Sequence, residues 1–219
     1  MIKLAIFDLD GTLLDTLGDI AGACNHALTV CGCPVHEVGE YKRFVGSGIM
    51  NLFRRALPEE QRTEEMVIRM RNAFVQYYDI HKDDTTRPYP GIRDLLKNLS
   101  AKSIALAVAS NKYQEATEEL VARYFGDYSF TCILGQREGH PIKPDAGIIF
   151  ETMAACEGVR PDEVIYCGDS DVDMQTGINA GVKTVGVTWG FRSREELAAY
   201  SPCLLADNPE EIHNFIALT

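Results

Sequence analysis

Short runs of apolar residues alternate with stretches of helical periodicity along most of the chain. The apolar runs comprise residues 4–7, 104–109, 131–134, 164–167 and 184–187. Continuous runs this short are typical of strands that are buried on both faces of a parallel sheet. Apolar residues recur at helical spacing between these runs, from Gln114 to Phe125 and from Ile148 to near Gly158. The alternation predicts right-handed crossovers and an α/β parallel sheet covered on both faces.

The alternation of strands and helices is interrupted once, between Asp15 and Pro88. This region carries helical periodicity at residues 20–30, 49–57 and 64–80, and it has no convincing strand pattern. The segment Arg87–Gly91 contains two prolines and a glycine, which end a helix because they remove amide donors and favour a turn. We therefore predict an all-helical cap at residues 16–87, inserted into an α/β core formed by residues 1–15 and 88–219. A capping box at residues 193–196 and the pattern at 210–218 predict two later helices.

Composition narrows the class of protein further. The 219 residues include 21 lysines and arginines against 32 acidic residues, so the formal charge is −11. A negative field of this size disfavours nucleic acid as a partner. No apolar run approaches the roughly 20 residues that cross a membrane, and no signal peptide is evident at the first residues, so we expect a cytoplasmic protein. The seven cysteines are an odd number and mostly lie far apart, and we expect them to be reduced core thiols.

Acidic residues follow two of the predicted strands directly. Asp8 and Asp10 end the first apolar run, and alternation along an extended backbone sends both to the same side. Two carboxylates this close suggest a metal site or an acid–base pair, although a solvated turn has the same composition. The segment Gly168–Asp173 contains three more aspartates, of which Asp171 is at a position typical of a helix cap. Oxygen ligands of this kind suit Mg²⁺.

Two further polar segments are expected at the same edge of the sheet. Ser110 and Asn111 follow the apolar run that ends at Ala109, and Lys143 precedes a predicted helix. Either segment alone would be an ordinary turn or a solvated surface position. Open α/β sheets bind ligands outside the carboxyl ends of their strands, so the convergence of these groups with the two acidic segments predicts one site.

These segments resemble the four motifs of the haloacid dehalogenase superfamily, and they occur in the family's order over nearly the whole chain. The motifs are Asp8–Thr12, Ser110–Asn111, Lys143 and Gly168–Asp173. The resemblance implies a doubly wound, Rossmann-like core with an inserted helical cap. The stretches Phe7–Thr16, Tyr89–Gly91 and Thr188–Phe191 are similar to members of the phosphoglycolate phosphatase type. The segment Lys143–Ala146 departs from the pattern, because many members have a second proline at the position of Ala146.

The resemblance also implies roles for individual residues. Asp8 would be the nucleophile that becomes an aspartyl phosphate, and Asp10 the general acid and then the general base. Lys143 would supply a cation, while Ser110 and Asn111 would donate hydrogen bonds to phosphoryl oxygens. The ligands of Mg²⁺ would be Asp8, the carbonyl oxygen of Asp10, and Asp169. Asp173 would orient Lys143 or a metal-bound water. Thr12 would belong to the substrate-binding residues and hold the carboxylates in place.

Substrate choice is expected to lie in the cap, because the core contacts only the phosphoryl group. Gly46, Ser47 and Gly48 resemble the glycine-containing specificity loop of such caps, whose backbone amides can approach a small anion. Arg43 lies beside this loop and could pair with a carboxylate on the substrate, although it could equally be a solvated surface cation.

The resemblance favours a Mg²⁺-dependent phosphatase acting on a small phosphorylated metabolite, with phosphoglycolate the first candidate substrate. Pyrophosphate and sugar phosphates are further candidates. A phosphomutase of the β-phosphoglucomutase type would use the same two aspartates, and a non-catalytic protein of the same fold is a third class. We expect a monomer or a homodimer that binds neither nucleic acid nor a membrane.

Overall fold

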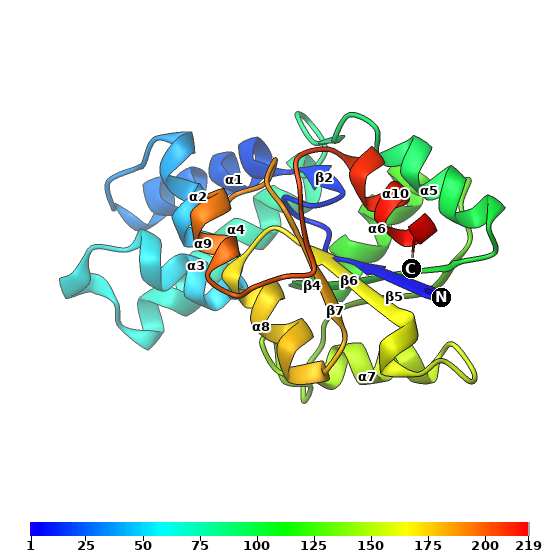
Figure 1. Ribbon diagram of the computed structural model, residues 1–219. Coiled ribbons are helices and arrows are strands. Elements are labelled where there is room, and N and C mark those ends of the chain that lie inside the picture. The colour runs from blue at the N-terminus through cyan, green and yellow to red at the C-terminus, as the bar shows by residue number, and fades with distance from the viewer. Residues whose placement is uncertain (219) are drawn as a thin grey trace.

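The computed structural model describes residues 1–218, and over these residues it contains a six-stranded parallel sheet in the order β5-β4-β1-β6-β7-β8 (Figure 1). The strands are β1 (Leu4–Phe7), β4 (Ala105–Tyr113), β5 (Phe130–Gln136), β6 (Val164–Gly168), β7 (Lys183–Val187) and β8 (Leu204–Ala206). Each strand runs parallel to its neighbours. The predicted α/β class is therefore confirmed. The edge strand β8 was not expected, because its three residues are too short a run and only Ala206 is buried.

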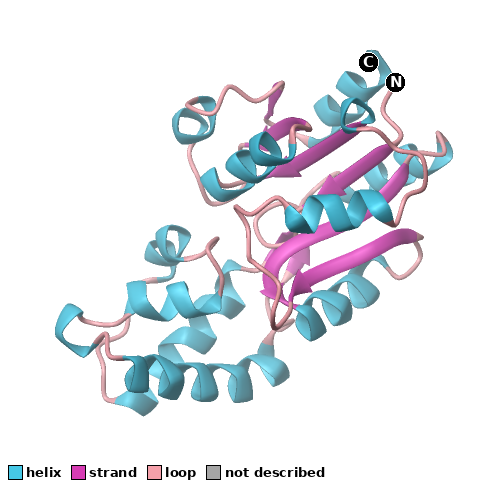
Figure 2. Cartoon of the chain, turned by 90° about the horizontal axis from the view of Figure 1, so that it is seen from below, coloured by secondary structure: helices cyan, strands magenta, loops and turns pink. Residues whose placement is uncertain are grey.

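Helices cover both faces of the sheet (Figure 2). Alternate residues of β1 face opposite layers, so Phe7 packs on one face and Ile6 on the other. The layer around Phe7 is formed by α5 (Ile92–Ala101), α6 (Gln114–Phe125) and α10 (Pro209–Leu218). The layer around Ile6 includes α7 (Gly147–Ala154) and the last residue of α8 (Asp171–Ala180). The short helix α9 (Arg194–Ala198) begins with the predicted capping box, in which the Ser193 side chain accepts a bond from the Glu196 amide.

The region between β2 (Leu14–Asp15) and β3 (Arg87–Pro88) is helical, as the sequence predicted. Its helices are α1 (Leu17–Cys31), α2 (Tyr41–Phe44), α3 (Ile49–Ala56) and α4 (Glu64–His81). They bury most of a second apolar cluster, which includes Phe53, Met70, Phe74 and Tyr78 and is joined by Ala116 and Phe191 of the core. Burial of this cluster away from the sheet is why the segment forms a separate helical layer beside the core.

Both chain crossings between the core and the helical segment are held together. β2 and β3 pair antiparallel, with Leu14 opposite Pro88 and Asp15 opposite Arg87. One turn further, the buried carboxylate of Asp19 accepts bonds from the amides and hydroxyls of Thr85 and Thr86, at 2.6–3.1 Å. The division into residues 16–87 and the two core segments remains our proposal, and this pairing is its structural support.

The cysteines follow the sequence prediction in part. All seven are free thiols, and Cys24, Cys31, Cys33 and Cys167 are buried. The expectation that all seven lie in the core is wrong for the others, because Cys132 and Cys156 are half-buried and Cys203 is exposed.

Replacing Asp19 is expected to destabilise the crossing at Thr85 and Thr86. Asp19→Ala would leave the amides and hydroxyls of the buried Thr86 and the more exposed Thr85 without their acceptor, and we expect the free energy of unfolding to fall by about 2–4 kcal/mol. Urea unfolding of Asp19→Ala and of Asp94→Ala provides the measurement, because Asp94 is an exposed aspartate in the first turn of α5. Equal stability of the two variants would show that the Asp19 contacts contribute nothing.

Candidate active site

The turn after β1 places two aspartates at the edge of the sheet. The Asp8 amide donates to the Cys167 carbonyl at 2.9 Å, which extends the pairing of β1 with β6 by one residue. The chain then turns tightly, with the amides of Leu13 and Leu14 both donating to the Leu9 carbonyl at 3.0 Å. Gly11 occupies this turn with φ of +83°, and a Cβ there would lie 2.3 Å from an oxygen of Asp169. Only glycine allows the turn to approach that carboxylate.

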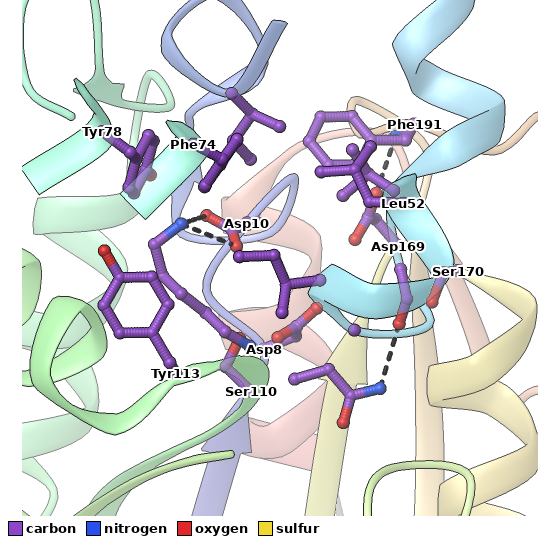
Figure 3. A pocket seen from close by; sticks show the side chains of 17 residues that line it. Asp8, Asp10, Leu52, Phe74, Tyr78, Ser110, Tyr113, Asp169, Ser170 and Phe191 are labelled. Carbon is purple, nitrogen blue, oxygen red and sulfur yellow. Dashed lines mark hydrogen bonds and ion pairs between the residues drawn. The ribbon is translucent and has the colours of Figure 1, made fainter. Parts of the chain in front are cut away.

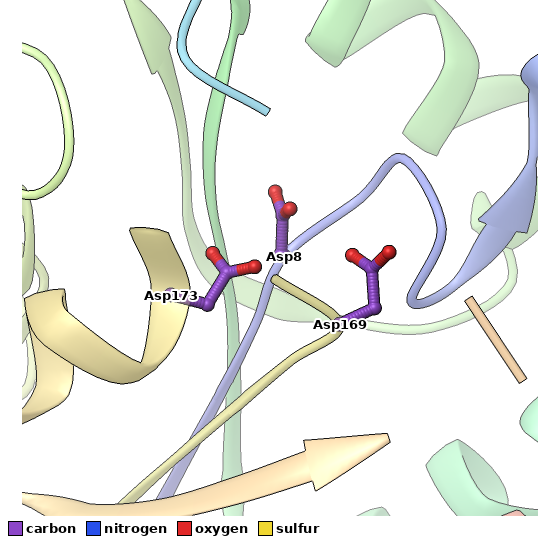
Figure 4. Close-up of side chains that lie close together, drawn as sticks. All are labelled: Asp8, Asp169 and Asp173. Atoms are coloured by element: carbon purple, nitrogen blue, oxygen red, sulfur yellow. The ribbon is translucent and has the colours of Figure 1, made fainter. Parts of the chain in front are cut away.

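Three buried carboxylates converge beside this turn. One oxygen from each of Asp8, Asp169 and Asp173 lies within 4.8 Å of the others, and Figure 4 shows the three carboxylates side by side. Asp169 and Asp173 come from the end of β6 and the first turn of α8. The sequence predicted that the two acidic segments would meet, and the parallel pairing of β1 with β6 is the reason that they do.

Lys143 is the cation at the centre of this cluster. Its Nζ lies 3.0 Å from Asp8 and 2.7 Å from Asp173, and the residue is 1% exposed. The same ammonium donates to the Tyr166 hydroxyl at 2.8 Å and to the Ala109 carbonyl at 3.1 Å. Asp173 also accepts from the hydroxyls of Tyr166 and Ser170, at 2.7 and 2.6 Å. Every polar atom of this lysine and aspartate is therefore used by the protein itself.

The pKa values separate the paired acid from the other two. Burial favours the neutral form of Asp173, but the adjacent ammonium and three hydrogen-bond donors hold its pKa below the usual value. Burial also opposes the charge on Lys143, yet Asp173 and Asp8 raise its pKa to about 12. Burial raises the pKa of Asp8 to about 7 against the pull of Lys143, and it raises the pKa of Asp169 well above the usual range. Asp8 and Asp169 therefore have too little positive charge around them to stabilise their ionised forms.

This charge imbalance fits a divalent cation. Three carboxylates and one ammonium leave two negative charges in excess in a buried space, and such charges are costly unless a cation accompanies them. Asp8 and Asp169 provide the ligand oxygens, whereas the oxygens of Asp173 are occupied by Lys143, Tyr166 and Ser170. Hard carboxylate oxygens of this kind suit Mg²⁺, which takes one or two carboxylates and completes its shell with other oxygens.

The sequence suggested that Ser110 and Asn111 follow the strand that ends at Ala109. In the structure both residues lie within β4. Both are buried and line the same pocket as Asp8. The Asn111 side chain accepts from the Lys143 amide at 2.8 Å and donates to the Gly46 carbonyl at 3.0 Å. Asn111 therefore joins the lysine segment of the core to the cap loop.

Lys112 is a residue of the site that sequence reasoning did not single out. Its Nζ donates to both carboxylate oxygens of Asp10, at 3.0 and 3.1 Å, and its side chain is 5% exposed. The pairing of β4 with β5 shifts between Ala109 and Tyr113, and the four successive residues from Ser110 to Tyr113 all line the pocket. A lysine next to two expected ligands at a strand end was the available signal, but it was read as part of a turn.

The pocket lies between the strand ends and the cap (Figure 3). Its core side contains Asp8, Asp10, Ser110 and Asp169. The cap side is mostly apolar, and it consists of Ile20, Val45, Gly46, Gly48, Ile49, Leu52, Phe74 and Tyr78. The arrangement places reactive carboxylates below and a largely apolar wall above.

Only some of the cap residues that the sequence pointed to lie at the pocket. Gly46 and Gly48 line the pocket, but Ser47 does not, and its hydroxyl accepts a bond from Arg55 at 3.0 Å. Arg43 is exposed and borders a different groove, together with Asp171 and Glu196. Thr12 is buried below the pocket, where its hydroxyl is 3.3 Å from an oxygen of Asp169. This position suits the expected role of fixing a carboxylate.

Arg192 connects the core to the cap and was also missed. It comes from the loop between β7 and α9, pairs with Asp171 at 3.0 Å, and donates to the carbonyls of Lys42 and Val45. Together with Asn111, it holds the cap loop over the strand ends. No local sequence pattern marks this arginine, because its two partners in the cap are 150 and 147 residues away in the chain.

None of the helices among residues 1–218 is both long and apolar enough to span a membrane.

Known proteins are similar to this chain over most of its length. Residues 5–187 match the family of haloacid dehalogenase-like hydrolases. A phosphoglycolate phosphatase of Pseudomonas putida is 31% identical, over 94% of this chain and 76% of its own length. One from Vibrio parahaemolyticus is 28% identical, over 100% and 97%. A crystal structure from Lactobacillus delbrueckii, of a protein provisionally named a phosphoglycolate phosphatase, is 35% identical with a TM-score of 0.91 and covers 98% of each chain.

The family match extends across both acidic segments, Lys143 and the whole cap. The solved structure shares the same arrangement of sheet and helices over nearly every residue. The chain therefore belongs to the haloacid dehalogenase-like hydrolases and is similar over its full length to phosphatases of that family.

Proposed function

We propose that the protein is a Mg²⁺-dependent phosphatase that hydrolyses a small phosphate monoester, with 2-phosphoglycolate as the leading substrate. The observation that carries this proposal is the buried cluster of Asp8, Asp169 and Asp173 around Lys143, which opens into a pocket that also contains Asp10. The relatives named phosphoglycolate phosphatase support both the reaction and the substrate.

Asp8 is the proposed nucleophile. One of its oxygens is held by the Leu9 amide at 2.7 Å and by Lys143, so the carboxylate has a fixed orientation at the pocket floor. Attack on phosphorus would form an aspartyl phosphate and release the alcohol. Asp10 would first give a proton to the leaving oxygen and then accept one from the water that hydrolyses the intermediate.

The neighbouring groups would hold and neutralise the phosphoryl group. Ser110 and Asn111 would donate hydrogen bonds to its oxygens, while Lys143 offsets part of the negative charge. A bound Mg²⁺, held by Asp8, Asp169 and the carbonyl oxygen of Asp10, would supply the remaining charge neutralisation that lets a carboxylate approach a phosphate. Asp173 would fix Lys143 in place, and Gly46, Ser47 and Gly48 would form the loop that closes over the substrate.

The cap wall favours a simple hydrolase over a sugar phosphomutase. Among the described cap residues that line the pocket, Tyr78 is the only one whose side chain carries a polar atom. A sugar would bring several hydroxyls against Ile20, Leu52 and Phe74, where they would lose hydrogen bonds to water without replacement. Inorganic pyrophosphate remains a second candidate substrate, although its charged leaving group would be costlier still against this apolar wall unless Lys112 paired with it.

Loss of the Asp8 carboxylate is expected to remove the activity. Asp8→Asn should lower the rate of phosphate release from 2-phosphoglycolate by at least about 1,000-fold, because an amide is a poor nucleophile. Phosphate release with Mg²⁺ and without any bisphosphate primer is the measurement, and Asp94→Asn on the exposed face of α5 is the matched control. Near-normal turnover by Asp8→Asn would contradict the proposal, and a requirement for a bisphosphate would indicate a mutase.

Mg²⁺ is expected to stabilise the folded protein by relieving repulsion within the aspartate cluster. A thermal melt of the metal-free protein should shift upward on addition of Mg²⁺, because the ion binds only the folded state. Asp169→Asn removes one proposed ligand, and we expect it to raise the Mg²⁺ concentration at the midpoint of that shift by about 10-fold or more. An unchanged Mg²⁺ dependence in this variant would exclude Asp169 as a ligand.

A further inference from the structure

Two polar groups in the pocket have no part in the chemistry proposed above. Lys112 is the only cation among the described residues that line the pocket. Tyr78 is only 1% exposed, and its buried hydroxyl has no hydrogen-bond partner among the described residues. Buried hydroxyls are normally paired, so an unpaired one on a residue that lines a pocket points to a missing ligand atom.

The two groups lie next to each other and to Asp10. The Lys112 ammonium is 4.7 Å from the centre of the Tyr78 ring, and both its recorded hydrogen bonds go to Asp10. An ammonium has three N–H groups and can accept a further anionic partner. Figure 3 shows Tyr78 and Asp10 on the same side of the pocket, with Phe74 beside them.

We propose that Lys112 and the Tyr78 hydroxyl form a binding site for a carboxylate on the leaving group, which makes phosphate esters of short hydroxy acids the substrate class. This inference rests on the proposed phosphatase function, because it places the leaving group beside Asp10. It transfers carboxylate recognition from Arg43, where the sequence suggested it, to the end of β4.

The distances limit the length of the leaving group. An ester oxygen that receives a proton from Asp10 lies about 3 Å from that carboxylate, and Lys112 is 3.0 Å beyond it. The ester oxygen is therefore within about 6 Å of the ammonium. A carboxylate one carbon away from the ester oxygen bridges that gap, whereas a long acid would pass Lys112 and meet Ile20 and Phe74.

Arg43 has no comparable position. It is exposed and borders a groove that shares no lining residue with the pocket. The cap loop that follows Arg43 is tied down by Arg192 and Asn111, through the carbonyls of Val45 and Gly46. In this arrangement of the cap, Lys112 is the positive charge that the leaving group of a bound ester would meet.

Two esters that differ only in this charge test the proposal. We expect the wild-type protein to hydrolyse 2-phosphoglycolate with a higher kcat/KM than ethyl phosphate, whose leaving group is uncharged. Lys112→Met should lower the ratio of the two kcat/KM values by about 10- to 100-fold, the size expected for a charge-assisted contact. Tyr78→Phe keeps the ring and removes only the hydroxyl, and it should lower the ratio by about 2- to 10-fold. Lys97→Met removes an exposed lysine of α5 and should leave the ratio unchanged.

The ratio separates recognition from any effect on Asp10. If Lys112 acted only by positioning Asp10, its replacement would lower kcat/KM for both esters equally, and the unchanged ratio would overturn the proposal. A ratio that collapses in Arg43→Ala and persists in Lys112→Met and Tyr78→Phe would overturn it as well. Equal hydrolysis of both esters by the wild type would leave the phosphatase in place and reject the carboxylate site. Absence of phosphate release from every ester with Mg²⁺ would instead reject the proposed function itself.

Discussion

The pairing of buried carboxylates with too few cations is the interaction on which the rest of the site depends. Asp8, Asp169 and Asp173 meet at the strand ends, and Lys143 compensates only one of their charges. Asp173 and Lys143 form a closed, fully bonded pair, which keeps the ammonium beside Asp8. A divalent cation would compensate the remaining charge on Asp8 and Asp169, so the folded core is suited to a metal and a phosphate together.

The architecture separates the chemistry from recognition. The parallel sheet brings β1, β4 and β6 to one edge, and their ends supply the acids, the amide and the hydroxyl. The helical cap covers that edge with apolar side chains and is held there by Arg192 and Asn111. An apolar cover lowers the local dielectric, which strengthens each charge interaction beneath it. It also leaves few hydrogen-bond partners for a polar leaving group. Lys112 and the Tyr78 hydroxyl beside Asp10 would therefore largely determine which ester binds.

Much of this arrangement could be predicted from the sequence, because short apolar runs and acidic strand ends are local signals. The parallel sheet, the helical insertion and the meeting of Asp8 with Asp169 followed from them. Lys112 and Arg192 were missed because each acts through a partner that only the fold brings near: Lys112 through Asp10, and Arg192 through the carbonyls of the cap loop. Arg43 lies outside the pocket for the converse reason, since proximity in sequence to the glycine loop does not decide which way a helix of four residues presents its side chains.

The most direct test of the account is the chemical state of Asp8 during turnover. Wild-type protein would be mixed with 2-phosphoglycolate and Mg²⁺, quenched in acid within the first turnover, digested, and analysed by mass spectrometry. The account predicts a phosphoryl group on the peptide that contains Asp8, which disappears as phosphate is released. Phosphate release with no such adduct at any time, or an adduct on another residue, would contradict it.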